Sequence, residues 1–99
     1  MEAAARALAD PTRREILGLV RGEEHTASEI AARFPVSRPA ISQHLRVLQE
    51  AALVTCRPDG TRRWYRARPE GAAELRAWLD DFWAAGLERL KHEVEQEQR

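Results

Sequence analysis

The stretch from Ser37 to Glu50, SRPAISQHLRVLQE, constrains the fold most strongly, because it has the apolar spacing of a helix with one buried face. The apolar side chains recur at i, i+4 and i+7, at Ile41, Leu45 and Leu48. Ser37 is a favourable N-cap, and we expect Val36 and Ile41 to form a hydrophobic staple beside it. The stretch therefore predicts an amphipathic helix, which we term the recognition helix.

The polar face of the recognition helix carries hydroxyl, amide and guanidinium groups. Gln and Arg hydrogen-bond base edges in the major groove of DNA, while Ser and a helix N-terminus hold phosphate. His44 lies at the border of the apolar stripe, where it is either a DNA contact or a packing residue. An ordinary surface helix has the same spacing, so the flanking segments have to decide between the two interpretations. The predicted DNA contacts of this helix are Ser37, Arg38, Pro39, Ser42, Gln43, His44 and Arg46.

The segments before the recognition helix predict a helix-turn-helix motif. An Asp-Pro pair starts a helix over residues 11–21. Thr26 and Glu29 have the spacing of a capping box, which opens a short helix ending near Phe34. Two short helices, a tight turn and an amphipathic second helix make the motif, which we assign to residues 26–50.

The segment after the recognition helix predicts a β-hairpin over residues 53–68. An Asp-Gly pair separates two strand-like runs there, which is the strongest short-range hairpin signal. A basic hairpin in this position is a wing that reaches the DNA backbone or the minor groove. The alternative is a solvated Arg-rich ribbon. The predicted DNA contacts of the wing are Arg57, Arg62 and Arg63.

Charge is distributed unevenly along the chain, although the formal net charge is zero. Residues 37–68 contain seven Arg and two acids, a net charge of +5. Residues 1–36 contain five Arg and six acids, a net charge of −1, and residues 69–99 contain four basic and eight acidic residues, a net charge of −4. Positive charge on the helix and wing alone indicates a nucleic-acid surface, and the acidic end is expected to point away from it.

Residues 70–94 predict a long helix with a wide apolar stripe. About 25 residues span roughly 37 Å, more than a domain of this size needs for its own core. Two Trp and a Phe on such a helix leave an exposed apolar patch, which a second copy of the chain would cover. Gly86 lies in the stripe, explained either by close approach of a second backbone or by a kink. The predicted dimer interface consists of Leu8, Leu75, Trp78, Leu79, Phe82, Trp83, Leu87 and Leu90.

Length and composition limit the remaining possibilities. A chain of 99 residues with 43% hydrophobic and 32% charged residues is one globular domain. A single cysteine excludes an internal disulfide and, with no apolar run long enough for a membrane span, indicates a cytoplasmic protein. No Gly-rich phosphate loop, nucleophile with a base, or paired carboxylates are present, so we expect no enzymatic activity and no cofactor.

Three motifs, ALADPTRREIL, SRPAISQHLRVLQEAALV and DGTRRWYR, occur in order over about residues 5–68 and resemble the ArsR/SmtB family of winged-helix regulators. The resemblance implies a homodimer joined by its N- and C-terminal helices, with the recognition helix in the major groove, and repression released by an effector. Two positions depart from the family, which usually has Gly where this chain has Pro35 and Ala52. A left-handed Ala52 would cost about 1 kcal/mol.

The resemblance also raises the question of metal sensing. The thiol ligands of the family's arsenic and cadmium sensors would fall near residues 26–31, where this chain has no cysteine. A zinc or nickel site from Asp81, His92 and Glu95 across a dimer is the weaker alternative to a solvated helix face, and we expect no metal. His25 is expected to be exposed, and Cys56 to be a small core residue.

The sequence as a whole predicts a mainly α protein with a small β-hairpin, a winged helix-turn-helix in one domain over residues 1–99. Residues 1–9 and 70–94 are the expected dimerisation helices, and 95–99 a polar tail. The predicted function is a homodimeric repressor that binds an inverted repeat in double-stranded DNA, its recognition helices one turn, about 34 Å, apart. The alternatives are a nickel- or zinc-responsive regulator and a winged-helix interaction module without DNA binding.

Overall fold

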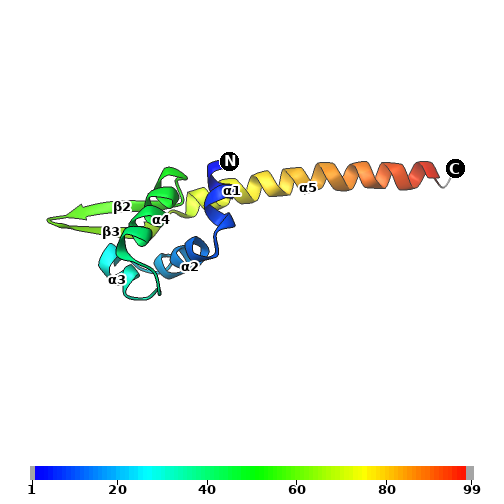
Figure 1. Cartoon of the computed structure of the whole chain (residues 1–99). Helices are drawn as coiled ribbons and strands as arrows, with labels where there is room; N and C mark the ends of the chain where they lie inside the picture. Colours follow the sequence, from blue (N-terminus) through cyan, green and yellow to red (C-terminus); the bar gives the residue numbers. More distant parts are fainter. Residues whose placement is uncertain (1, 98–99) are drawn as a thin grey trace.

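The computed structural model describes residues 2–97, in which four helices and a small sheet form a body and a fifth helix projects from it (Figure 1). The predicted fold class, a mainly α winged helix-turn-helix, is confirmed. The elements in chain order are α1 (Glu2–Ala9), α2 (Pro11–Val20), β1 (His25–Thr26), α3 (Ala27–Ala31), α4 (Arg38–Glu50), β2 (Val54–Asp59), β3 (Arg62–Ala67) and α5 (Pro69–Glu97).

The core lies where α2, α3 and α4 meet the first residues of β2. The stripe predicted for the recognition helix is buried, because Ile41, Leu45 and Leu48 of α4 are at most 1% exposed. These side chains pack in one cluster with Ile16, Val20, Ile30 and Leu53, which are also fully buried. The predicted wing residue Tyr65 closes the same cluster. The core therefore holds α4 by one face and leaves its other face outside.

Three side-chain caps fix where the helices of the body begin, as the sequence predicts. Asp10 Oδ1 accepts from the backbone N–H of Arg13 at 3.1 Å, and Ser37 Oγ from that of Ala40 at 3.2 Å. Thr26 and Glu29 form the complete capping box. Each cap satisfies a backbone donor that the helix itself leaves unpaired. Caps are local in sequence, which is why they could be identified without the structure.

The turn between α3 and α4 is longer than predicted. Helix α3 ends at Ala31, and not near Phe34, and two hydrogen bonds, from Arg33 N to Ile30 O at 3.0 Å and from Phe34 N to Ala31 O at 3.4 Å, continue the helical path. Pro35 contributes to this longer turn, because it has no N–H to donate to Ala31 O and it disfavours helical conformation at Phe34. Val36 is 38% exposed, which argues against a tight staple on Ile41.

The sheet has three strands in the order β1-β3-β2: the predicted two-stranded wing, β2 and β3, is confirmed, and the short strand β1, which the sequence did not predict, joins it. Strands β2 and β3 pair antiparallel from Val54↔Ala67 to Asp59↔Arg62, leaving a two-residue loop at Gly60-Thr61. Gly60 has φ +62 and Thr61 has no positive φ, which is the pattern of a type II′ hairpin turn. The Asp-Gly signal located the hairpin correctly, but Asp59 belongs to the strand.

His25 is buried, at 7% exposure, which corrects the prediction that it is exposed. It lies in β1 opposite Tyr65, and this pairing turns its side chain toward the body. Its Nδ1 lies 3.1 Å from Glu29 Oε2, so the capping glutamate of α3 also fixes the imidazole. The two-residue strand β1 is too short to show any periodicity in the sequence.

The chain leaves α4 through a left-handed residue. Ala52 has φ +58 and is the only residue other than glycine with a positive φ among residues 2–97. The N–H of Leu53 donates to Leu48 O at 3.0 Å, which closes the six-residue ring of a Schellman cap. Ala52, which stands where the family usually has Gly, therefore adopts a backbone conformation that lowers the stability of the folded chain. Gly71, which has no room for a Cβ beside the Ala52 carbonyl, lets α5 start against this cap.

Ala52→Gly is expected to raise the free energy of unfolding by about 0.5–1 kcal/mol, because glycine has no steric penalty in the left-handed region. Urea unfolding followed by circular dichroism measures the change. The matched control is Ala51→Gly, where φ is −80 and the substitution should destabilise. If both variants shift the midpoint in the same direction, the left-handed cap is not a source of strain.

Helix α5 extends beyond the body (Figure 1), and its large apolar side chains are exposed to solvent. It has 29 residues, about 43 Å at 1.5 Å per residue, and the whole chain measures 68 × 25 × 20 Å. It ends at Glu97, so residues 95–97 of the predicted tail are helical, while 98 and 99 lie outside the described residues. The large apolar residues that are 41–61% exposed on it are Trp78, Leu79, Phe82, Trp83, Leu87, Leu90 and Val94. Within residues 2–97, no helix is long and apolar enough to cross a membrane.

Candidate nucleic-acid interface

A cleft of about 450 Å³ lies between α4 and the hairpin, and we term it the α4–wing cleft. Arg38 and Ser42 line it on the helix side, and Arg62 and Arg63 line it on the wing side. The hairpin register explains how neighbouring wing residues share one site: the two-residue turn brings the start of β3 to the tip, where both guanidinium groups are exposed. The structure thus gathers predicted contacts from two elements around one basic concavity.

The exposed face of α4 holds the other predicted contacts of the recognition helix. Ser37, Pro39, Gln43 and Arg46 are all exposed, as are Arg38 and Ser42. None of the side chains of Arg38, Ser42, Gln43 and Arg46 forms a hydrogen bond or ion pair with another described residue. Side chains without partners in the protein have donors and acceptors available for a ligand. The face therefore has both the position and the free groups that base recognition needs.

Tyr65 contributes a neutral hydroxyl to the floor of the cleft. Burial raises the pKa of Tyr65, and the adjacent Cys56 raises it further, while Arg63 lowers it. The phenol therefore stays protonated at neutral pH and adds no negative charge beside the two wing arginines. Cys56 itself is half-buried against the core, as predicted.

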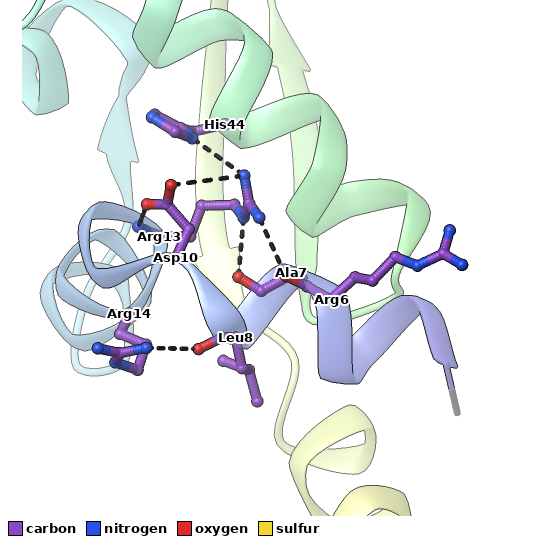
Figure 2. Close-up of polar contacts among 7 residues, drawn as sticks. All are labelled: Arg6, Ala7, Leu8, Asp10, Arg13, Arg14 and His44. Atoms are coloured by element: carbon purple, nitrogen blue, oxygen red, sulfur yellow. Dashed lines mark hydrogen bonds and ion pairs between the residues drawn. The ribbon is translucent and has the colours of Figure 1, made fainter.

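The side chain of His44 points from α4 toward α2, and not to the open side of α4 (Figure 2). Its Nδ1 lies 3.4 Å from Arg13 Nη1, and its side chain is half-buried. The same guanidinium donates to the carbonyls of Ala7 at 2.8 Å and Arg6 at 2.9 Å. Arg13 thus ties the C-terminus of α1 to the middle of α4. Of the two interpretations of His44, this geometry favours the packing residue.

Arg13 is a positioning residue that the sequence argument missed. It lies in the first turn of α2, where the helix dipole disfavours a positive charge, so a second partner should have been sought. Asp10 is part of that answer: its Oδ2 lies 4.0 Å from Arg13 Nη1. The N–H of Arg13, which donates to the Asp10 carboxylate, lowers the pKa of that carboxyl. The two side chains hold the α1–α2 corner against the recognition helix (Figure 2).

Arg57 is engaged within the protein, unlike the two arginines at the wing tip. Its Nε donates to Glu24 Oε2 at 3.0 Å, and its guanidinium carbon lies 5.8 Å from the centre of the Trp64 ring. Arg57 pairs with Trp64 in the hairpin register, so both lie on the same face of the sheet. This placement separates Arg57 from the α4–wing cleft.

The structure does not bring the weaker metal candidates together in one chain. Asp81 and Glu95 are 14 residues apart on one straight helix, about 21 Å at 1.5 Å per residue. His92 Nε2 lies 2.9 Å from the side-chain nitrogen of Gln96. Within residues 2–97, no three His, Cys, Asp or Glu side chains group as metal ligands.

Comparisons with known proteins agree with this geometry. A family described as a helix-turn-helix domain matches residues 8–57. The HTH-type transcriptional regulator Rv2034 of Mycobacterium tuberculosis is 52% identical over 82% of this chain and 76% of that protein. The transcriptional repressor SdpR of Bacillus subtilis is 35% identical over 78% of this chain and 86% of that protein.

Solved structures show the same arrangement over most of the chain. An ArsR-like transcriptional regulator from Rhodococcus sp. RHA1 superposes with a TM-score of 0.88 and 35% identity, covering 96% of this chain and 86% of that one. A homodimeric winged helix-turn-helix DNA-binding domain from Mycobacterium bovis, described as a possible ArsR-family regulator, has a TM-score of 0.68 and 30% identity. It covers 84% of this chain and 77% of that one.

Proposed function

This chain belongs to the ArsR/SmtB family of winged helix-turn-helix transcriptional regulators, which are not enzymes, and from that premise we propose that it is a homodimeric repressor of an inverted-repeat operator. The observation that carries the proposal is the α4–wing cleft, where Arg38 and Ser42 of the helix and Arg62 and Arg63 of the wing surround a basic concavity. A groove of this kind, between an amphipathic helix and a hairpin, fits the edge of a DNA duplex.

The roles within the interface follow from the chemistry of each side chain. Arg38, Gln43 and Arg46 on α4 read base edges in the major groove, since guanidinium and amide groups make paired hydrogen bonds there. Arg62 and Arg63 hold phosphate or the minor groove at the wing. The N–H of Arg38 in the first turn of α4 binds a phosphate beside it, since Pro39 has no N–H and the N–H groups of the next residues donate to Ser37. His44 and Arg57 have protein partners and act on DNA only through the position of α4 and the sheet.

The charge distribution supports the same orientation. The +5 segment contains α4 and the hairpin of β2 and β3, whereas the −4 segment contains α5. In Figure 1 the wing and the C-terminus lie at opposite ends of the molecule. DNA bound in the cleft is therefore attracted by the positive charge of α4 and the hairpin, and it lies far from the acidic helix α5.

The homodimer is supported by the exposed stripe of α5. Phe82, Trp83 and Leu87 are 57–61% exposed, which leaves a contiguous apolar surface that a lone chain would present to water. Leu8 of α1 is half-buried against the core, and we assign it to the same proposed interface. Two-fold symmetry presents two recognition helices, which match the two arms of an inverted repeat.

Selection from random DNA duplexes tests the proposal. The full-length protein should enrich sequences with two inverted arms, and a gel shift with the selected duplex should show a single dimeric complex. An interaction module that has lost DNA binding would enrich nothing. Enrichment of a single asymmetric site would retain DNA binding and reject the two-fold arrangement.

Arg62→Ala should weaken binding to selected and random duplexes alike, because phosphate contacts carry no sequence information. The log–log dependence of affinity on salt should become shallower by about one unit for each lost phosphate contact, and so by about two in a dimer. The control is Arg21→Ala, which removes the same charge beside the start of α5 and should leave the slope unchanged. A collapse of base preference with an unchanged slope would mean that the wing reads bases.

A further inference from the structure

A pocket of about 250 Å³ lies where the body meets the start of α5, and we term it the junction pocket. Leu53 is only 2% exposed, so the pocket reaches down to the core. None of its lining residues also lines the α4–wing cleft, so the two sites are separate. Its apolar walls come from α2, from the residue after the α4 cap, and from the passage between β3 and α5: Leu17, Leu53, Ala67, Pro69 and Ala72.

The apolar walls favour an apolar occupant over water. A bound water needs about two to four polar partners, and these side chains offer none. An apolar group gains free energy in proportion to the surface that it removes from water. At about 30 Å³ for each water-sized group, the pocket holds about eight non-hydrogen atoms. A benzene ring or a short alkyl chain fits this volume, whereas a helix, about 10 Å across, does not.

Two arginines complete the lining of the junction pocket. Arg21 is the exposed C-cap of α2, and its side chain forms no hydrogen bond or ion pair with another residue of the range 2–97. Arg68 donates with Nη1 to the carbonyl of Ala52 at 3.3 Å, and the same nitrogen lies 4.0 Å from Glu74 Oε1. The donors of Arg21, and the remaining ones of Arg68, are therefore available for an acceptor group of a ligand.

The charges beside the pocket leave a positive balance. Glu74 is exposed, and its long contact neutralises Arg68 only in part. The C-terminus of α2 adjoins the pocket at Arg21 and the N-terminus of α5 adjoins it at Pro69, so the two helix dipoles oppose each other there. Two arginines and one glutamate leave a side-chain charge of +1. This charge favours an anion, and a carboxylate matches the paired donors of a guanidinium group.

We propose that the junction pocket binds a small apolar carboxylate. Its hydrocarbon part packs on Leu17 and Leu53, and its carboxylate accepts hydrogen bonds from Arg21 and Arg68. Because the walls come from α2, β3 and α5 together, the ligand bridges the body and the first turn of α5. The inference goes beyond the proposed function: it assigns a second kind of ligand to a site that shares no residue with the DNA interface.

Titration of the full-length, ¹⁵N-labelled protein with benzoate and with hexanoate tests the proposal. The two acids differ in shape, and at least one should bind with a dissociation constant of roughly 0.1–1 mM. The backbone amides of Leu53, Ala67 and Ala72 should shift, and those of Arg38 and Ser42 in the α4–wing cleft should not. Benzamide and hexanamide, which lack the charge, should bind about tenfold more weakly than their acids. Absence of shifts with both acids, or equal binding of an acid and its amide, would overturn the proposal.

Two substitutions test the two parts of the site. Arg21→Ala should weaken binding of the acid about tenfold through the lost charged hydrogen bonds. Ala72→Leu should fill the pocket and abolish binding, whereas Ala73→Leu, at the neighbouring exposed alanine outside the lining, is the matched control. Unchanged binding in Ala72→Leu would reject the pocket as the site.

A carboxylate could instead bind to the basic α4–wing cleft, and Arg62→Ala distinguishes this case. Binding of the acid should be the same in Arg62→Ala as in the unmodified protein. Loss of binding in Arg62→Ala, with binding kept in Arg21→Ala, would place the acid in the α4–wing cleft and overturn the inference. No measurement in this series uses DNA, so its failure leaves the proposed function intact.

Discussion

Phe82→Glu is expected to give a folded monomer that has lost most of its affinity for the operator. Phe82 is 57% exposed and contacts Trp78 in a stacked pair 5.5 Å apart, both on the projecting part of α5. The body and the α4–wing cleft therefore remain as they are. A carboxylate in the apolar interface has no partner, which costs several kcal/mol at each of its two positions.

Light scattering and a gel shift with the selected duplex measure the two effects of this substitution. The matched control is Ala84→Glu, which adds the same charge on the face of α5 that carries Asp80 and Glu88, away from the stripe, and should leave both measurements unchanged. A folded Phe82→Glu monomer that binds the operator as tightly as the unmodified protein would show that DNA binding does not depend on the two-fold arrangement.

Arg38→Ala and Gln43→Ala are each expected to weaken operator binding by about 1–3 kcal/mol for each half-site and to relax base preference at one position per half-site. Both side chains are exposed in the first half of α4, where a recognition helix meets base edges. Neither side chain forms a hydrogen bond or an ion pair with another residue in the described part of the chain. Affinity for random duplexes should change less in Gln43→Ala, because an amide contributes no charge.

Gln49→Ala is the matched control, since it removes the same amide group from the C-terminal end of α4, which is expected to lie outside the groove. Binding to a panel of single-base variants of the selected duplex identifies which base each residue reads. His44→Ala should instead lower the stability of the protein through the lost contact with Arg13 and leave base preference in place. Unchanged base preference in both Arg38→Ala and Gln43→Ala would move the readout to another surface.

The parts of the fold that could be predicted are those with local signals. The buried face of α4 follows from spacing within eight residues, and each cap joins residues three positions apart. Strand β1 has no such signal, because its two residues pair with Tyr65 and Trp64 some 40 positions later. The wrong expectation for His25 has the same origin: its burial depends on this distant strand pairing.

The candidate site likewise has features that local sequence patterns predict and features that depend on residues far away in the sequence. Exposure of Arg38, Gln43 and Arg46 follows from the helical period, and the sequence places them correctly on the polar face of α4. The partners of His44 and Arg57 are Arg13 and Glu24, 31 and 33 residues away, and nothing in the local pattern names them. Sequence alone predicts which side chains face outward, but not which of those the protein itself has already engaged.

The unbroken length of α5 has a consequence for the operator. Helix α5 spans about 43 Å at 1.5 Å per residue, and the body lies at its start (Figure 1). In the proposed homodimer, the length over which two copies of α5 overlap sets the distance between the two bodies, and with it the distance between the two half-sites. A straight helix also resists twisting, so it fixes the rotational phase of the two DNA sites as well as their distance. In the proposed homodimer, the residue count of α5 would therefore limit the spacer lengths that an operator can have, a property that no DNA-contacting residue carries.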